Sequence, residues 1–147
     1  MYGYRTQYRR MMAYLAVAQQ DHGNTIQKED ELITFFMHCW HLKDHLKNDP
    51  TVERSLHVRL CKRAHSSPIL KATKEIANGT KHGKLKDPVA MKGAHDLTVG
   101  PLGVHPQAKT YPLVSMSKGQ PVRAIDVAEM AVRRWKAILT KGGLKVS

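Results

Sequence analysis

The chain has 147 residues, which is enough for one ordinary globular domain with its own hydrophobic core. Hydrophobic residues make up 41% and charged residues 24%, a normal globular balance, and no apolar run approaches the about 20 residues of a membrane span. We therefore expect no membrane partner.

The charge is strongly one-sided, with 24 Lys and Arg against 12 Asp and Glu, a net charge of +12 and a pI near 9.9. Such a field favours a polyanion, RNA or DNA, as partner. The alternative is that the charge serves solubility or docking to an acidic protein. Cys39 and Cys61 are too few for a disulfide framework, so we expect free thiols in a reducing cytoplasm.

Helical spacing begins near the N-terminus and predicts a first helix over residues 4–20. Its inner positions are Tyr4, Tyr8, Met11, Leu15 and Ala18. Gly23 suits the left-handed position after a helix. Arg9-Arg10 followed by an apolar run also has the outline of a short signal peptide, but the helical spacing favours the helix.

The second helix, predicted over residues 29–48, is the expected centre of the fold. One apolar face is formed by Leu32, Phe35, Cys39, Leu42 and Leu46. We expect Trp40 to be buried and every other helix to pack on this one. His38, His41 and His45 lie on the other flank, where we expect His38 and His45 to be at least partly exposed.

Two Xaa-Pro pairs predict the starts of the next two helices, over residues 50–66 and 68–82. Asp49 before Pro50 and Ser67 before Pro68 each combine a capping residue with proline at the first helical position. Helical spacing then disappears over residues 84–119, where short strands are expected at 97–99 and 111–114. Pro112 should confine its strand to a sheet edge. A last helix is predicted over residues 123–141.

The predicted fold is therefore all-α. A single domain would contain an antiparallel four-helix bundle, an insertion with a small hairpin, and a fifth C-terminal helix.

The densest polar cluster is predicted at the end of the fourth helix. Lys74, Asn78 and His82 are each four residues apart and share one helical face, with Lys81 beside them. Imidazole can move a proton and lysine can stabilise a phosphorane-like transition state, which are the needs of phosphodiester cleavage. Ordinary capping and dipole preferences explain the same residues without any catalysis, and spacing alone favours that explanation.

Histidines on the second helix form another candidate cluster. Their spacing could place two imidazoles on one metal ion, but a solvated helix flank is the better interpretation, and no metal or other cofactor is predicted. His41 and Asp44 stand at the border of the apolar face. There Asp44 could orient His41 or pair with a cation from the fourth helix.

Basic residues on the third helix and after the fourth are the expected nucleic-acid contacts. They are Arg59, Lys62, Arg63, Lys84 and Lys86. Arg59 and His65 form a third, lower-ranked site candidate.

Three segments together carry a family resemblance: FFMHCWHLKDHLKND, IANGTKH and AVRRWKAIL. In this combination the chain resembles a group of uncharacterised bacterial helical proteins, which is in turn similar to the HEPN superfamily of four-helix bundles. The resemblance covers the second to fourth helices and the last one.

The resemblance implies a homodimer that binds RNA, in a defence or toxin system. HEPN ribonucleases cut RNA without metal through an Arg-polar-x-x-x-His motif. Aligned on His82, Asn78 takes the polar position, but Ala77 replaces the arginine. Lys74 and Lys81 are candidates for the missing cation. Two hypotheses stay open: the protein is a metal-independent endoribonuclease, or it is a catalytically inactive relative that binds RNA.

Overall fold

A computed structural model describes residues 2–82, 90–92, 99–100, 103–104, 111–115 and 121–146. Among these residues, only the backbone is described at 25, 80–82, 90–92, 99–100, 103–104 and 115. The described residues form five helices: α1 Tyr4–Gln19, α2 Thr25–Asn48, α3 Arg54–Ser66, α4 Pro68–His82 and α5 Ala124–Lys141. The fold is mostly helical, as predicted. None of the described helices is long and apolar enough to cross a membrane.

Helix α2 is the centre of the fold, because it contacts α1, α3, α4 and α5. Its predicted inner residues are fully buried. These are Leu32, Phe35, Cys39, Leu42 and Leu46, each 0% exposed. Trp40 is 6% exposed, and Trp135 of α5 donates its indole N–H to the carbonyl oxygen of Cys39 at 3.0 Å. The apolar face predicted for the first helix is also buried, and α5 buries an apolar face that includes Ala131, Trp135 and Leu139.

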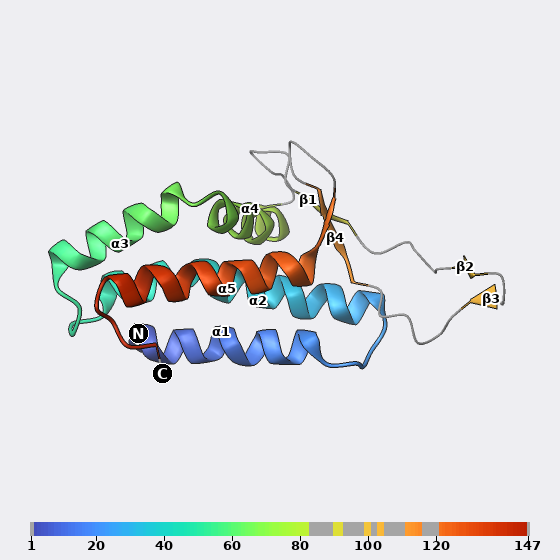
Figure 1. Cartoon of the computed structure of the whole chain (residues 1–147), viewed down its shortest axis with the longest axis horizontal. Coiled ribbons are helices and arrows are strands. Elements are labelled where there is room, and N and C mark those ends of the chain that lie inside the picture. Colours follow the sequence, from blue (N-terminus) through green and yellow to red (C-terminus); the bar gives the residue numbers. More distant parts are fainter. Residues whose placement is uncertain are drawn as a thin grey trace.

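Helix direction departs from a simple antiparallel bundle. The start of α1 lies near the ends of both α2 and α5, since Tyr4 bonds to Asp49 and to the carbonyl of Lys145. Consequently α1 is antiparallel to both helices, and α2 and α5 run in the same direction (Figure 1). Figure 1 also shows α1 and α3 on opposite sides of this parallel pair, so α3 has a face of its own.

Two helix starts differ from the prediction. Helix α2 begins at Thr25 rather than 29, because the side chain of Asn24 accepts the backbone N–H of Gln27 and caps it. Helix α3 begins at Arg54 rather than 50, because the Asp49 carboxylate is engaged by Thr51 and Tyr4. The Asp49-Pro50 cap was therefore wrong. The Ser67-Pro68 cap is confirmed, since Ser67 Oγ accepts the N–H of Leu70.

The strands form two small sheets. β1 (Ala90–Lys92), β4 (Leu113–Ser115) and β5 (Val122–Arg123) pair in the order β1-β4-β5, all antiparallel. β4 is the middle strand, so the edge position expected from Pro112 was wrong. Pro112 precedes the strand, and its carbonyl accepts the N–H of Ala124 at 2.7 Å. β2 (Val99–Gly100) and β3 (Gly103–Val104) also pair antiparallel. The strands predicted at 97–99 and 111–114 do not form a hairpin with each other among the described residues, because β4 pairs with β1 and β5.

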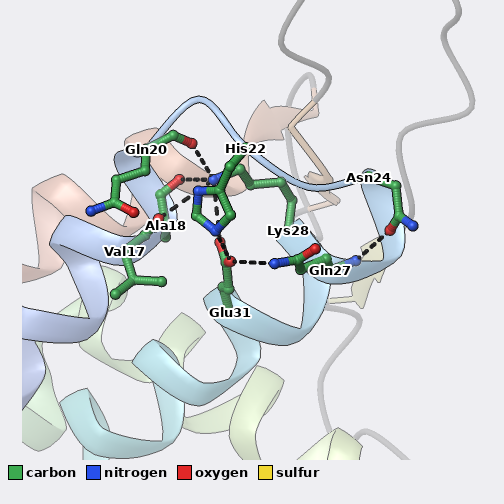
Figure 2. A network of polar contacts seen from close by, with 8 residues as sticks. All are labelled: Val17, Ala18, Gln20, His22, Asn24, Gln27, Lys28 and Glu31. Atoms are coloured by element: carbon green, nitrogen blue, oxygen red, sulfur yellow. Dashed lines mark hydrogen bonds and ion pairs between the residues drawn. The ribbon is translucent and has the colours of Figure 1, made fainter.

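The turn between α1 and α2 is built on a buried lysine (Figure 2). Lys28, 6% exposed, donates from Nζ to the carbonyl oxygens of Ala18 at 3.0 Å and of Gln20. The last carbonyls of a helix have no partner within it, so this ammonium replaces the missing backbone donors. Glu31 lies 3.2 Å from the same Nζ and 2.8 Å from His22 Nε2. Lys28 thus joins the end of α1 to the start of α2.

Candidate nucleic-acid interface

A hollow of about 370 Å³ lies between α2 and α3, and we call it the α2–α3 cleft. Antiparallel packing places the last two turns of α2 beside the middle of α3. The lining residues are Lys43, Asp44 and Lys47 of α2, with His57, Val58, Cys61, Lys62 and His65 of α3. Three lysines, two imidazoles and one carboxylate therefore surround one surface hollow.

The single carboxylate of the cleft is already neutralised. Asp44 Oδ1 lies 2.6 Å from Lys43 Nζ. Within the described part of the chain, Lys47 and Lys62 have no ion-pair partner. Both side chains are exposed. The cleft consequently presents two uncompensated ammonium groups from two different helices, an arrangement suited to an anion.

Trp40 contacts two of the residues that line this cleft, Lys43 and His65. Lys43 Nζ and Lys74 Nζ lie 5.1 and 5.8 Å from the centroid of its ring. The ring of His65 meets the same indole edge-on at 5.1 Å. The cation–π geometry brings Lys74 of α4 towards the α2–α3 junction. The prediction that Lys74 shares one helical face with Asn78 and His82 did not include this contact with Trp40.

The titratable groups in the cleft differ in what they can do. Burial, together with the charges of Lys43 and Lys74, lowers the pKa of His65 from its ordinary 6.5, so its ring is neutral at pH 7. Burial raises the pKa of the Cys61 thiol, whose Sγ lies 3.5 Å from the carbonyl oxygen of Lys43. The Cys61 thiol therefore stays protonated at neutral pH, whereas His65 is able to accept a proton.

The predicted catalytic cluster is described only in part. Helix α4 does extend to His82, so the backbone spacing of Lys74, Asn78 and His82 is confirmed. Asn78 is half-buried, and Lys74 is directed to Trp40. The side chains of Lys81 and His82 lie outside the described residues, as do Lys84 and Lys86 entirely.

The structure does not bring together the other predicted pair, His41 and Asp44. His41 is exposed on α2 and does not line the cleft. Asp44 does line it, with Lys43 of its own helix as partner, rather than His41 or a cation of α4. Where side chains are described, no group of three or more His, Cys, Asp or Glu is placed to hold a metal ion.

The remaining histidines of α2 face α1. His38 is half-buried, with its ring stacked on Tyr14 at 4.5 Å, and burial lowers its pKa. His45 is only 9% exposed, so the expected partial exposure of this residue was wrong. Tyr2 covers it, because the two rings stack at 4.6 Å and His45 Nδ1 lies 2.7 Å from the Tyr2 carbonyl oxygen.

The predicted basic residues of α3 extend the interface to its other flank. Arg59 and Lys62 are exposed, and Arg63 is half-buried. Arg63 lines a second hollow of about 150 Å³, here called the α3–α5 hollow. The other lining residues, all from α5, are Arg134, Ala137, Ile138 and Lys141.

Sequence reasoning missed Lys43, Lys47, His57, Arg134 and Lys141 as site residues. The spacing of four between Lys43 and Lys47 already placed both on one side of α2. What the sequence did not contain was the helix that packs beside them. No protein-family model, curated protein or solved structure matches this chain.

Proposed function

We propose that this protein binds RNA by its phosphate backbone at the α2–α3 cleft. The observation that carries the proposal is the pair Lys47 and Lys62, two exposed ammonium groups without a carboxylate partner among the described residues, on both walls of one hollow. Phosphate oxygens are the natural ligands of such a pair, because each contact releases condensed counterions.

The surrounding sequence strengthens the proposal. From Arg54 to Lys74 the chain contains six cations and no acid. They are Arg54, Arg59, Lys62, Arg63, Lys71 and Lys74. A basic field of this extent, on the side of the molecule away from α1, would guide a polyanion to the cleft.

The decisive experiment measures RNA affinity as a function of salt for wild type and for Lys47→Gln/Lys62→Gln. We expect wild-type affinity to fall steeply with salt, and the variant to bind more weakly with a slope lower by about two, one per lost phosphate contact. Arg5→Gln/Arg9→Gln, which removes the same charge from the exposed side of α1, is the matched control. Equal loss in both variants would instead indicate non-specific attraction by net charge.

The HEPN resemblance adds two further proposals, RNA cleavage and pairing of two subunits. His82 is the residue that the resemblance proposes for proton transfer, and His65 is an imidazole of the cleft whose pKa is lowered from its ordinary value, mainly by burial. Incubation with labelled RNA in EDTA, read for both mobility shift and cleavage, separates a binding protein from a metal-independent ribonuclease. Light scattering on the same preparation measures the number of subunits.

A further inference from the structure

We infer that the RNA held by this protein is a double helix, laid across α3 and gripped by its phosphates on both flanks of that helix. The inference rests on the proposed RNA binding and adds the form of the ligand. It comes from a different observation: the α3–α5 hollow, with Arg63, Arg134 and Lys141, lies on the flank of α3 opposite to the α2–α3 cleft.

The two hollows are separated by the width of one helix. An α-helix with its side chains is about 10–12 Å across. The cationic groups on the two flanks are therefore too far apart to hold one phosphate. They can hold two backbone segments, or one backbone that passes over α3. Either case requires a ligand that extends beyond the α2–α3 cleft.

The outer face of α3 carries a polar ridge between the hollows. Ser55, Arg59, Lys62 and Ser66 follow each other at spacings of four, three and four, and all four are exposed. Ser66 Oγ donates to the carbonyl oxygen of Lys62 at 2.9 Å, which leaves its lone pairs free to accept a hydrogen bond. Ser55 Oγ donates instead to the side-chain carboxylate of Glu53, at the N-terminal end of α3, at 2.9 Å.

The polar groups on the α3 face match the minor groove of double-stranded RNA. Double-stranded RNA displays 2′-hydroxyls in a wide, shallow minor groove bordered by phosphates, and proteins recognise it through those two groups. Hydroxyl and guanidinium groups on the ridge match the 2′-hydroxyls. The lysines and arginines of the two hollows match the phosphates on either side.

Single-stranded RNA would need a different surface. Single strands are held largely by bases stacked on exposed aromatic rings. Neither hollow is lined by Phe, Tyr or Trp. The aromatic lining of the α2–α3 cleft is the imidazoles of His57 and His65, and the His65 ring is already in edge contact with Trp40. Trp40 is 6% exposed, and the large exposed aromatic residues of the described chain, Tyr2 and Tyr14, belong to the N-terminal segment and α1. The α3 face therefore provides phosphate contacts without a large aromatic ring on which a base could stack.

The test compares ligands of one sequence as a duplex RNA, a single-stranded RNA and a duplex DNA, each longer than the about 16 base pairs that a double-stranded RNA-binding domain covers. We expect duplex RNA to bind most tightly. Single-stranded RNA that binds as tightly as the duplex would overturn the inference and leave the proposed function intact. Absence of binding to all three would remove the proposed function itself.

Two variants test the geometry. Arg134→Gln/Lys141→Gln, on α5, should lower the salt slope for duplex RNA by about two, as the cleft variant does, and should leave helical circular dichroism unchanged. Ser66→Ala should reduce the preference for duplex RNA over duplex DNA, since only RNA offers a 2′-hydroxyl. An Arg134/Lys141 variant with the affinity and slope of the Arg5/Arg9 control would show that the second flank does not touch the ligand.

Discussion

The carboxylate of Asp49 accepts the backbone N–H of Tyr4 at 3.0 Å, although the two residues are 45 positions apart. The same carboxylate accepts the hydroxyl and the N–H of Thr51 at 2.6 and 2.9 Å. Tyr4 is the first residue of α1, where unpaired N–H groups and the helix dipole favour a negative charge. Asp49 therefore joins the start of α1 to the end of α2.

Replacement of Asp49 should weaken this connection in a pH-dependent way. Burial alone would raise the pKa of the Asp49 carboxyl, but the hydrogen bonds from Thr51 and from the N–H of Tyr4 outweigh it, so the pKa lies below the ordinary 3.8. The stability that the carboxylate contributes is thus complete above the unfolded-state pKa and is lost as pH falls through the lower folded-state value.

We expect Asp49→Asn to reduce the free energy of unfolding at neutral pH by about 1–3 kcal/mol, measured by urea denaturation. The deficit relative to wild type should shrink below about pH 4, where the carboxyl of the unfolded chain begins to bind a proton, and should be lost as pH falls through the lower folded-state pKa. Asp30→Asn, an exposed position on α2, is the control and should be nearly neutral. A deficit that is constant from pH 7 to pH 3 would contradict the role of charge.

Lys28→Met should destabilise the α1–α2 turn. Methionine retains the apolar stem but leaves the carbonyls of Ala18 and Gln20, and the carboxylate of Glu31, without their shared donor (Figure 2). Loss of hydrogen bonds from a buried charged group should cost about 3 kcal/mol, read from the denaturant midpoint. Lys71→Met, on the exposed side of α4, is the matched control. Equal midpoints for the two variants would show that Lys28 does not stabilise the α1–α2 turn.

Trp40→Ala should lower the free energy of unfolding by about 3–5 kcal/mol, the usual cost of emptying a large aromatic site. The indole is 6% exposed and also positions Lys43 and Lys74. We therefore expect Trp40→Phe, which keeps an aromatic face, to retain more stability and more RNA affinity than Trp40→Ala. A Trp40→Ala protein with the wild-type midpoint would show that the indole does not contribute to the stability of the core.

Cleavage of RNA, if it is detected, should depend on a histidine and be independent of metal. His82→Ala should lower the rate by about 10²–10⁴, the usual contribution of a general acid or base, while EDTA has no effect and products end in a cyclic phosphate. His65→Ala is the parallel variant, because His65 lies in the cleft. A full rate in a folded His82→Ala protein, together with its loss in His65→Ala, would move the chemistry to the α2–α3 cleft.

Local patterns were enough to predict the five helices, except for the starts of α2 and α3. The spacing of apolar residues is set by the helical repeat itself, so the buried faces of α1, α2 and α5 follow from the sequence. Ser67 before Pro68 marks the start of α4, and Gly143, with φ of 78°, follows the end of α5. In each case the interacting groups are a few residues apart, so no knowledge of the tertiary structure is needed.

Contacts between distant segments were decided only by the tertiary structure. Asp49 looks like a cap for the following helix, yet its carboxylate also bonds to Tyr4. His45 lies on a polar flank of its helix, yet Tyr2 covers it. The candidate site is of the same kind. Lys47 and Lys62 become one anion site only because α3 packs antiparallel beside the end of α2, and helical periodicity contains no information about which helix that will be.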